Sequence, residues 1–211
     1  SGNEVDLSGL NDGPVNVEVT STDPAGNTSP IATAPITLDS TIPNTPTTPD
    51  LETASDTGKS DTDDITSDTT PTFTAPAGSG NPGDTVNLYA DGNPVGSATV
   101  QPDGSYSVTP DNPLAEGTPD IAVSFTDMAG NKSALSPILP VTIDSTLPLA
   151  PKITSPGVSN DTTPEITGTA EPGMKVNVAI DKDGDGNPEA TYETTTDPQG
   201  NWKVNLETAT P

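Results

Sequence analysis

Three aspartates at alternating positions mark the segment 181–189 (DKDGDGNPE) as the stretch most suited to chemistry. Asp181, Asp183 and Asp185 occupy positions 1, 3 and 5 of a D-x-D-x-D-G run, and a glycine at position 6 permits the sharp turn of a calcium loop. Asn187 and Glu189 add further oxygens. Position 12 is a tyrosine rather than the glutamate of an EF-hand, so the run predicts a calcium loop on a β-hairpin. The alternative is an ordinary Asp-Gly turn.

A second acidic stretch, residues 55–64 (SDTGKSDTDD), places four aspartates within nine residues. They are Asp56, Asp61, Asp63 and Asp64. This density of carboxylates predicts a second calcium site. The alternative is a solvated acidic loop that holds no ion.

A third group belongs to a stretch that occurs twice, at residues 19–43 and 123–148. Both copies contain an alternating strand, a T-x-D-x-A-G-N-x-S loop, a second strand and a D-S-T-x-P exit. Asp23 corresponds to Asp127 at a spacing of 104 residues, and Asp39 to Asp144 at 105. A period of this size is typical of one β-sandwich domain, so the chain is expected to be a tandem array.

The repeated aspartates are expected to meet where one domain joins the next. In an immunoglobulin-type sandwich the last strand exits at the pole opposite to the B–C and F–G loops, so it delivers its acidic end to those loops of the following domain. The expected calcium ligands are Asp39, Asp84, Asp127 and Asn131 at the first junction, Asp144 and Glu171 at the second, and Asp23 in the first repeat. The alternative is local, because D-x-x-G-N and D-S-T-x-P also form Asx turns.

The composition supports cations and argues against other partners. The chain has 31 acidic and six basic side chains and a net charge of −25, which excludes the basic surface that nucleic acids or anionic membranes require. It has no histidine and no cysteine, so disulfides, thiolate sites and the usual general base are absent. Oxygen ligands for Ca²⁺ or Mg²⁺ remain, and the protein is not expected to be an enzyme.

Low hydrophobicity and high charge alone would fit a disordered linker. Apolar residues nevertheless alternate cleanly, as at Val15, Val17 and Val19, between clusters of Gly, Pro, Asn and Asp. The pattern predicts an all-β protein of tandem immunoglobulin-like Greek-key β-sandwich domains that form a rod.

Three domains are expected: residues 1–41 as the C-terminal part of one, residues 42–147 as a complete one, and residues 148–211 as the N-terminal part of a third. Strands are predicted near residues 2–7, 15–21 and 35–39, and in the complete domain near 49–52, 70–75, 85–90, 95–100, 105–109, 121–126 and 139–144. Tyr106 and Trp202 share one strand position and are expected to pack in the core rather than to stack on a sugar.

Several of these stretches resemble bacterial immunoglobulin-like repeats of giant calcium-dependent adhesins exported by type I secretion. The matching residues are S-D-T-G-x-S-x-x-D (55–63), D-T-T-P (68–71 and 161–164), G-T-A-E-P-G (168–173) and the two repeated motifs above. The resemblance implies an extracellular, surface-anchored array stiffened by Ca²⁺ at its junctions, with ligand roles for Asp39, Asp127, Asp144 and Glu171. The loop 75–85 departs from the A-E-P-G form and has no glutamate.

The expected function is therefore a structural spacer of a bacterial adhesin that attaches to host cells or surfaces. Its expected partners are neighbouring repeats of the same chain and, through other parts of the full protein, a host receptor or glycan. A monomer without nucleic-acid binding or membrane insertion is expected. Two alternatives remain: a ligand- or glycan-binding module, which exposed aromatics would favour, and an accessory domain of a secreted polysaccharide hydrolase.

Overall fold

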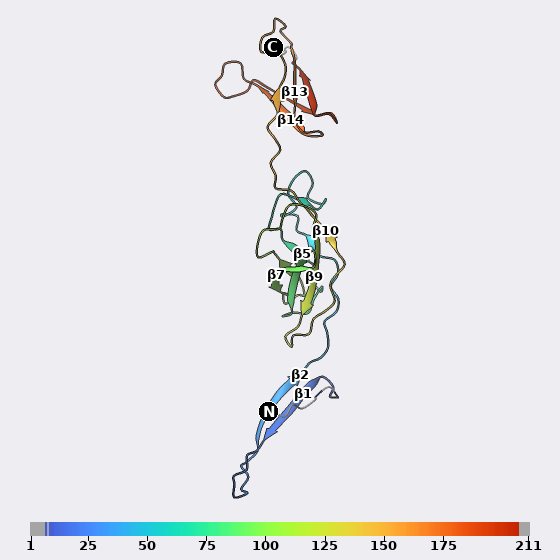
Figure 1. Cartoon of the computed structure of the whole chain (residues 1–211), viewed down its shortest axis with the longest axis vertical. Coiled ribbons are helices and arrows are strands. Elements are labelled where there is room, and N and C mark those ends of the chain that lie inside the picture. Colours follow the sequence, from blue (N-terminus) through green and yellow to red (C-terminus); the bar gives the residue numbers. More distant parts are fainter. Residues whose placement is uncertain (1–6, 8, 207–211) are drawn as a thin grey trace. The chain divides into compact units, whose positions relative to one another are not determined.

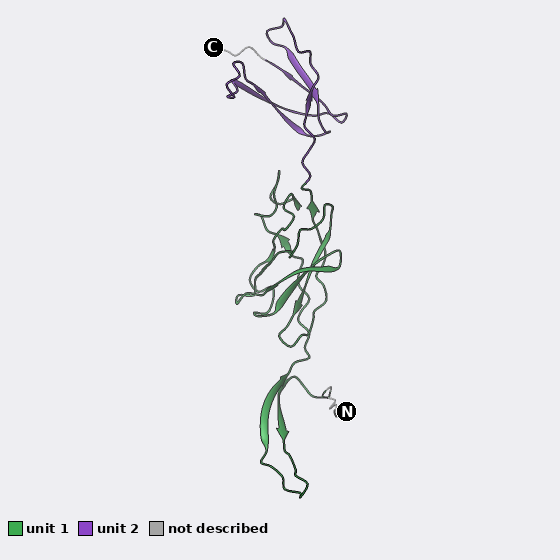
Figure 2. Cartoon of the chain, turned by 60° about the vertical axis from the view of Figure 1, so that its left-hand side comes forward, with its two compact units in different colours: residues 1–145 green, residues 146–211 purple. Residues whose placement is uncertain are grey.

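The computed structural model describes residues 7 and 9–206 and contains strands but no helix in that part of the chain. It divides into two compact units, residues 1–145 and 146–211 (Figure 2). The all-β prediction is thus confirmed. The strand expected near residues 2–7 lies almost wholly outside the described residues. No helix in the described part of the chain is long and apolar enough to cross a membrane.

The first unit begins with an antiparallel hairpin of β1 (Gly13–Val19) and β2 (Ala32–Leu38) (Figure 1). Val15 pairs with Ile36 and Val17 with Ala34. Directly opposed residues of an antiparallel pair share a face, so the valines of β1 and the apolar residues of β2 gather on one side of the ribbon.

The same unit contains a complete β-sandwich. One sheet has the order β3–β5–β8, and the other has the order β10–β9–β6–β7. Their bounds are β3 (Asp50–Leu51), β5 (Phe73–Ala75), β8 (Tyr106–Val108), β6 (Thr85–Ala90), β7 (Asn93–Thr99), β9 (Asp120–Thr126) and β10 (Leu139–Pro140). The short strands and the turns between them follow the alternation of the sequence, and the expected sandwich is confirmed.

The core of this sandwich consists of the inward-facing residues of both sheets. Phe73, Leu88, Ile121 and Val123 are fully buried there, although the core as a whole is small. Tyr106 contacts Phe125 edge to face, with ring centroids 5.8 Å apart, and burial raises its pKa to about 12. The prediction that Tyr106 packs in the core is therefore confirmed.

Two features of the sandwich differ from the expected strands. A short strand, β4 (Ile65–Thr66), follows the acidic loop and pairs in parallel with β11 (Thr142–Ile143). The single strand expected over 139–144 is split, because Pro140 cannot donate a hydrogen bond and the chain changes sheets beside it. Parallel strands that pair are far apart in sequence, so the residue pattern of one short segment does not predict the pairing.

The second unit has two small sheets, β12–β13–β16 and β14–β15. Their bounds are β12 (Lys152–Ile153), β13 (Glu165–Thr169), β14 (Lys175–Ile180), β15 (Ala190–Thr195) and β16 (Asn201–Asn205). Trp202 on β16 is only 5% exposed and pairs across the ladder with Gly168 on β13. In the complete domain the corresponding pair is Tyr106 and Ala75, so the second unit combines a larger ring with a smaller residue. The prediction that Trp202 packs in the core is also confirmed.

Gly168→Ala is expected to displace the indole of Trp202. A Cβ at residue 168 would lie 2.2 Å from the ring and 2.2 Å from the carbonyl oxygen of Lys152, and overpacking of this kind costs about 1–3 kcal/mol. Because Trp202 is the sole tryptophan, its emission should shift to the red. Gly157→Ala is the matched control, since nothing lies within 4 Å of its added Cβ. Equal spectra for both variants would contradict the close packing.

Candidate cation sites

The loop 181–189 connects β14 to β15 and is closed by the Glu189 N–H, which donates to the carbonyl of Ile180. One carboxylate oxygen from each of Asp181, Asp183 and Glu189 lies within 4.8 Å of the others, and all three residues are exposed. The hairpin position expected for this loop is confirmed. Its three converging carboxylates have the chemistry of an oxygen-ligand cation site.

Within this loop, backbone N–H groups already orient the carboxylates. Asp181 accepts from Gly184 at 2.7 Å and Gly186 at 2.9 Å, and these bonds, the Gly186 one foremost, lower the pKa of its carboxyl group. Asp185 does not belong to the converging group. Its two oxygens accept from the backbone and side-chain nitrogens of Asn187.

Asp183→Asn is expected to abolish calcium binding by this loop, because it removes one charge from the three converging carboxylates. Calorimetry should then count one ion fewer per chain. Asp185→Asn is the matched control, since that carboxylate is bonded to Asn187, and the variant should keep the ion. If Asp183→Asn bound as many ions as the unchanged chain, the run would be a turn and nothing more.

The second acidic stretch contributes three residues to a group of neighbouring aspartates, which we call the Asp56 cluster: Asp50, Asp56, Asp63 and Asp64. Asp56 is 4% exposed, and its Oδ1 has no hydrogen-bond partner among the described residues. Its Oδ2 accepts from the Asp64 N–H at 3.3 Å. Burial, followed by repulsion from Asp56, Asp50 and Asp63, raises the pKa of the Asp64 carboxyl group.

A buried carboxylate oxygen without a partner is unfavourable unless a cation or a proton meets it. The carboxylates that interact electrostatically with Asp64 come from β3, from the acidic loop and from the turn before β4. Asp50 was not among the expected ligands, because it precedes the acidic stretch and reaches it only through the sheet. Asp61 is exposed and is not among the carboxylates whose repulsion raises the pKa of Asp64.

At the base of the hairpin β1–β2, a cavity of about 360 Å³ is lined by three of the four ligands expected at the first junction. Asp39 comes from the hairpin, and Asp84 and Asp127 come from loops of the complete domain. The fourth, Asn131, donates from Nδ2 to the carbonyl oxygen of Asp39 at 3.0 Å. Asp84 is 6% exposed and accepts from Asn81 at 3.1 Å.

The D-x-x-G-N loop itself is a turn, and Asp127 shows how it forms. Its Oδ1 accepts from the N–H groups of Ala129 and Asn131, and its Oδ2 accepts from the Asn131 side chain. These bonds, the Asn131 side chain first, lower the pKa of the Asp127 carboxyl group. Asp23 makes the same three bonds, which also lower its pKa.

A third copy of this turn, at residues 197–201 (DPQGN), escaped the sequence reasoning. Asp197 accepts from the N–H groups of Gln199 and Asn201 and from the Asn201 side chain. It lies in the turn between β15 and β16. In these three loops the motif forms the same Asx turn, and a metal role would depend on the position of the turn in the fold.

The D-S-T-x-P exit is held by an acidic residue that was also missed. Asp12 accepts from the backbone and hydroxyl of Ser40, and Glu116 accepts from the same two groups of Ser145. The two acids are 104 residues apart, and each is followed directly by a glycine and, one or two residues later, by a proline. Aligning the two repeats would therefore have revealed them. These bonds hold the serine of each D-S-T-x-P exit against the acidic residue that precedes it in the same repeat.

The two residues expected at the second junction belong to different units. Asp144 follows β11, and its N–H donates to the carbonyl of Thr66. Glu171 accepts from the Leu149 N–H at 2.9 Å within the second unit. Their predicted meeting stays a prediction.

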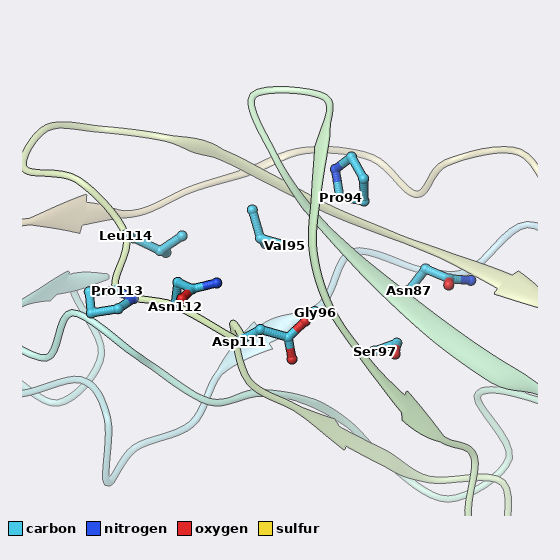
Figure 3. A pocket seen from close by; sticks show the side chains of 9 residues that line it. All are labelled: Asn87, Pro94, Val95, Gly96, Ser97, Asp111, Asn112, Pro113 and Leu114. Carbon is cyan, nitrogen blue, oxygen red and sulfur yellow. The ribbon is translucent and has the colours of Figure 1, made fainter.

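A further cavity, of about 370 Å³, lies beside β7 in the complete domain (Figure 3). Its side chains come from β6, from the segment 94–97 and from the segment 111–114, which approaches β7 through a bond from the Asp111 N–H to the Val95 carbonyl. No aromatic side chain lines it. All six aromatics of the chain are buried or half-buried, so no stacking platform favours a glycan-binding module.

Comparison with known proteins gave one family match and a match to a solved structure. Residues 41–145 match the family model described as a bacterial Ig-like domain. A solved structure described as a tetra-tandem repeat in the extending region of a large adhesion protein aligns at 26% identity and a TM-score of 0.34 over 96% of this chain. The chain spans 50% of that structure, and no curated protein shows a significant match. The sandwich of residues 41–145 is thus similar to bacterial Ig-like domains, and this similarity points to a structural, non-enzymatic domain.

Proposed function

We propose that this chain is a calcium-stiffened spacer segment of a bacterial cell-surface adhesin. The observation that carries the proposal is the cavity lined by Asp39 of one repeat and by Asp84 and Asp127 of the next, with Asn131 bonded to the Asp39 backbone. Carboxylates from two successive repeats share one space. A divalent cation that bound carboxylates of both repeats would link the two repeats.

Calcium suits the chemistry of this cavity better than a transition metal does. The chain has no histidine or cysteine, and Ca²⁺ takes six to eight oxygens from carboxylates, amides, carbonyls and water. The three carboxylates and the Asn81 side chain offer oxygens from both repeats. A space of about 360 Å³ leaves room for water to complete the coordination.

The adhesin assignment draws on the resemblance of the repeated motifs, which are close to those of the Salmonella giant non-fimbrial adhesin. In this proposal type I secretion delivers the protein to the outside of the cell, neighbouring repeats of the same chain are its structural partners, and a host receptor or glycan binds other parts of the full protein. The family match of residues 41–145 supports the structural role.

Pulsed electron paramagnetic resonance on the full chain tests the stiffening. The chain has no cysteine, so Glu18→Cys on the solvent face of the hairpin and Gln101→Cys in the complete domain give two unique labelling sites. The labelled protein is diluted with unlabelled chain, so that only distances within one molecule are measured. A narrow distance distribution in calcium and a broad one after chelation are expected; equal widths would overturn the proposal.

A further inference from the structure

The last strand of the complete domain, β11, pairs with β4, a short strand outside the two main sheets. The pairing is parallel and covers two residues of each strand. At one end the Thr142 N–H donates to the Asp64 carbonyl at 2.8 Å. At the other end the Asp144 N–H donates to the Thr66 carbonyl at 2.9 Å. The attachment of the last strand therefore depends on the position of β4.

β11 closes part of the core but is held by short contacts. Val141, which precedes the strand, is 0% exposed, and Ile143 within it is 1% exposed. Ile143 also exchanges two backbone hydrogen bonds with Gly117, at 2.8 and 3.0 Å. A strand that is held by a two-residue ladder and the bridge to Gly117 opens at lower cost than the central strands of a sheet. We therefore expect β11 to detach before β6 and β9.

β4 is in turn fastened to the start of the acidic loop. Thr66 is 1% exposed, and its hydroxyl lies 3.0 Å from the hydroxyl of Thr57. The Ser67 N–H donates to the same Thr57 hydroxyl at 2.9 Å. Residues 55–57 and 64–67 thus lie side by side and form the neck of the acidic loop. A change in this neck would move β4 and, with it, the partner that β11 needs.

The Asp56 cluster and the β4–β11 ladder share one residue, Asp64. Its N–H donates to Oδ2 of Asp56 at 3.3 Å, and its carbonyl accepts from Thr142 at 2.8 Å. Its φ of +57° lies in the left-handed region, which is unfavourable for a residue with a side chain. A ligand that held the Asp64 side chain would stabilise this conformation and, with it, the carbonyl to which Thr142 donates.

The buried carboxylate of Asp56 points to a ligand at this place. Asp56 is 4% exposed, and its Oδ1 has no hydrogen-bond partner among the described residues. Asp50 and Asp63 also repel Asp64, so four acidic side chains neighbour a buried oxygen that lacks a donor. Lys59 of the same loop is exposed and forms no ion pair in the described part of the chain. A bound cation would satisfy the oxygen and offset the charges.

We propose that the Asp56 cluster binds a calcium ion that fastens β11 to the sandwich. Its ligands come from three places: Asp50 on β3, Asp56 at the start of the acidic loop, and Asp63 and Asp64 just before β4. Ca²⁺ takes six to eight oxygens and accepts water among them, so four carboxylates form a sufficient set. Through Asp64 the ion holds β4, and through β4 it holds β11.

The role of this ion rests on the proposed function, because in a spacer the attachment of β11 sets where the linker to the next repeat begins. The D-S-T-x-P exit at residues 144–148 directly follows the strand. With the ion bound, the linker begins after β11. Without it, β11 joins the linker and lengthens it by up to about 3.6 Å per residue. The site is separate from the junction cavity, since the two share no residue.

Amide hydrogen exchange, followed by NMR on the full chain, tests the coupling between the ion and the strand. Calcium should slow exchange at the Thr142 and Asp144 N–H groups by about a hundredfold at one hundred times Kd, because opening β11 releases the ion. In chelator both groups should exchange faster than the amides of β6, which pairs on both edges. The Asp111 N–H, bonded to the Val95 carbonyl beside β7, is the control and should ignore calcium. Equal rates at Thr142 and Asp144 in calcium and chelator would overturn the proposal.

Substitutions in the acidic loop locate the ion. Asp56→Asn should abolish the effect of calcium on exchange in β11. Asp63→Asn tests the same site at an exposed residue, because asparagine can still accept the Ile65 N–H that Asp63 accepts at 3.3 Å. This variant should need more calcium for the same protection. Asp61→Asn is the control and should behave like the unchanged chain. Undiminished protection by calcium in Asp56→Asn, or in Asp63→Asn should the first variant fail to fold, would place the ion elsewhere.

A disulfide across the parallel ladder tests whether the chelated chain exchanges through detachment of β11. Ile65 and Thr142 are partners in that ladder, and the chain has no cysteine of its own. The double variant Ile65→Cys, Thr142→Cys should therefore form a bond that ties β4 to β11. In chelator the oxidised form should exchange its Asp144 N–H as slowly as the amides of β6, and reduction should restore fast exchange. Equally fast exchange in both forms would contradict detachment of the strand.

Asp56→Asn and Asp84→Asn separate this site from the junction cavity. In calcium, Asp56→Asn should keep the narrow distance distribution between labels at residues 18 and 101 but lose the slow exchange at Thr142. Asp84→Asn should keep the slow exchange and lose the narrow distribution. If exchange in β11 ignored calcium while the distance distribution still responded to it, the Asp56 cluster would not hold the strand, and the proposed function would stand.

Discussion

Removing calcium with a chelator is expected to lower the thermal unfolding midpoint of the complete domain by about 10–20 °C. One ion at one hundred times its Kd stabilises the folded state by about 2.7 kcal/mol, and one kcal/mol moves the midpoint of a domain of this size by about 4–8 °C. We expect the Asp56 cluster to be responsible, because it lies within the domain and the buried Oδ1 of Asp56 has no hydrogen-bond partner among the described residues. Differential scanning calorimetry with and without chelator measures the shift.

Asp56→Asn should separate the two contributions of this carboxylate. Without calcium the variant should be more stable than the unchanged chain, because it removes a buried charge next to Asp64 and Asp50. With calcium it should be less stable, because the ion has lost a ligand. The order of the two melting midpoints should therefore reverse when calcium is added.

Asp61→Asn is the matched control for this experiment. It makes the same change in the same loop, but at an exposed residue, and it should keep the full calcium response. An Asp56→Asn variant that still gained as much from calcium as the unchanged chain would show that the cluster is not the stabilising site.

Local sequence patterns predicted the strands and turns of this protein better than its long-range contacts. Alternation placed β6 and β9 within one residue of their observed bounds, because core residues recur at every second position: Val86, Leu88 and Ala90 in β6, and Ile121, Val123 and Phe125 in β9. The D-x-D-x-D-G run predicted its hairpin loop correctly because the residues that form the loop are neighbours in sequence. Parallel β4 and the contribution of Asp50 were not predicted, because both arise from pairing between distant segments.

Comparing the three copies of the D-x-x-G-N turn separates its local role from the role that its position in the fold adds. Asp23, Asp127 and Asp197 all make the same Asx turn, and Asp127 also lines a cavity together with Asp39 of the preceding repeat. Residue type and spacing therefore specify the turn, and the fold decides whether the turn also meets a second acidic element.

Asp84→Asn is expected to uncouple the hairpin from the complete domain even when calcium is present. Asp84 is the most buried of the three carboxylates in the junction cavity, so its charge is the least screened by water. Losing it should weaken calcium binding there by roughly tenfold or more, since an adjacent carboxylate contributes at least about 1.4 kcal/mol. With labels at residues 18 and 101, the calcium-bound variant should give the broad distance distribution of the chelated parent.

The variant should leave both neighbouring folds intact, because Asn can still accept the bond from Asn81 that Asp84 accepts. Asp111→Asn is the control: it removes one charge from the same domain at the cavity beside β7, and it should keep the narrow distribution. The Asn131 bond to the Asp39 carbonyl is present in both variants, so any difference between them reports the ion rather than that bond. A narrow distribution for Asp84→Asn in calcium would mean that hydrogen bonds, and not calcium, hold the junction.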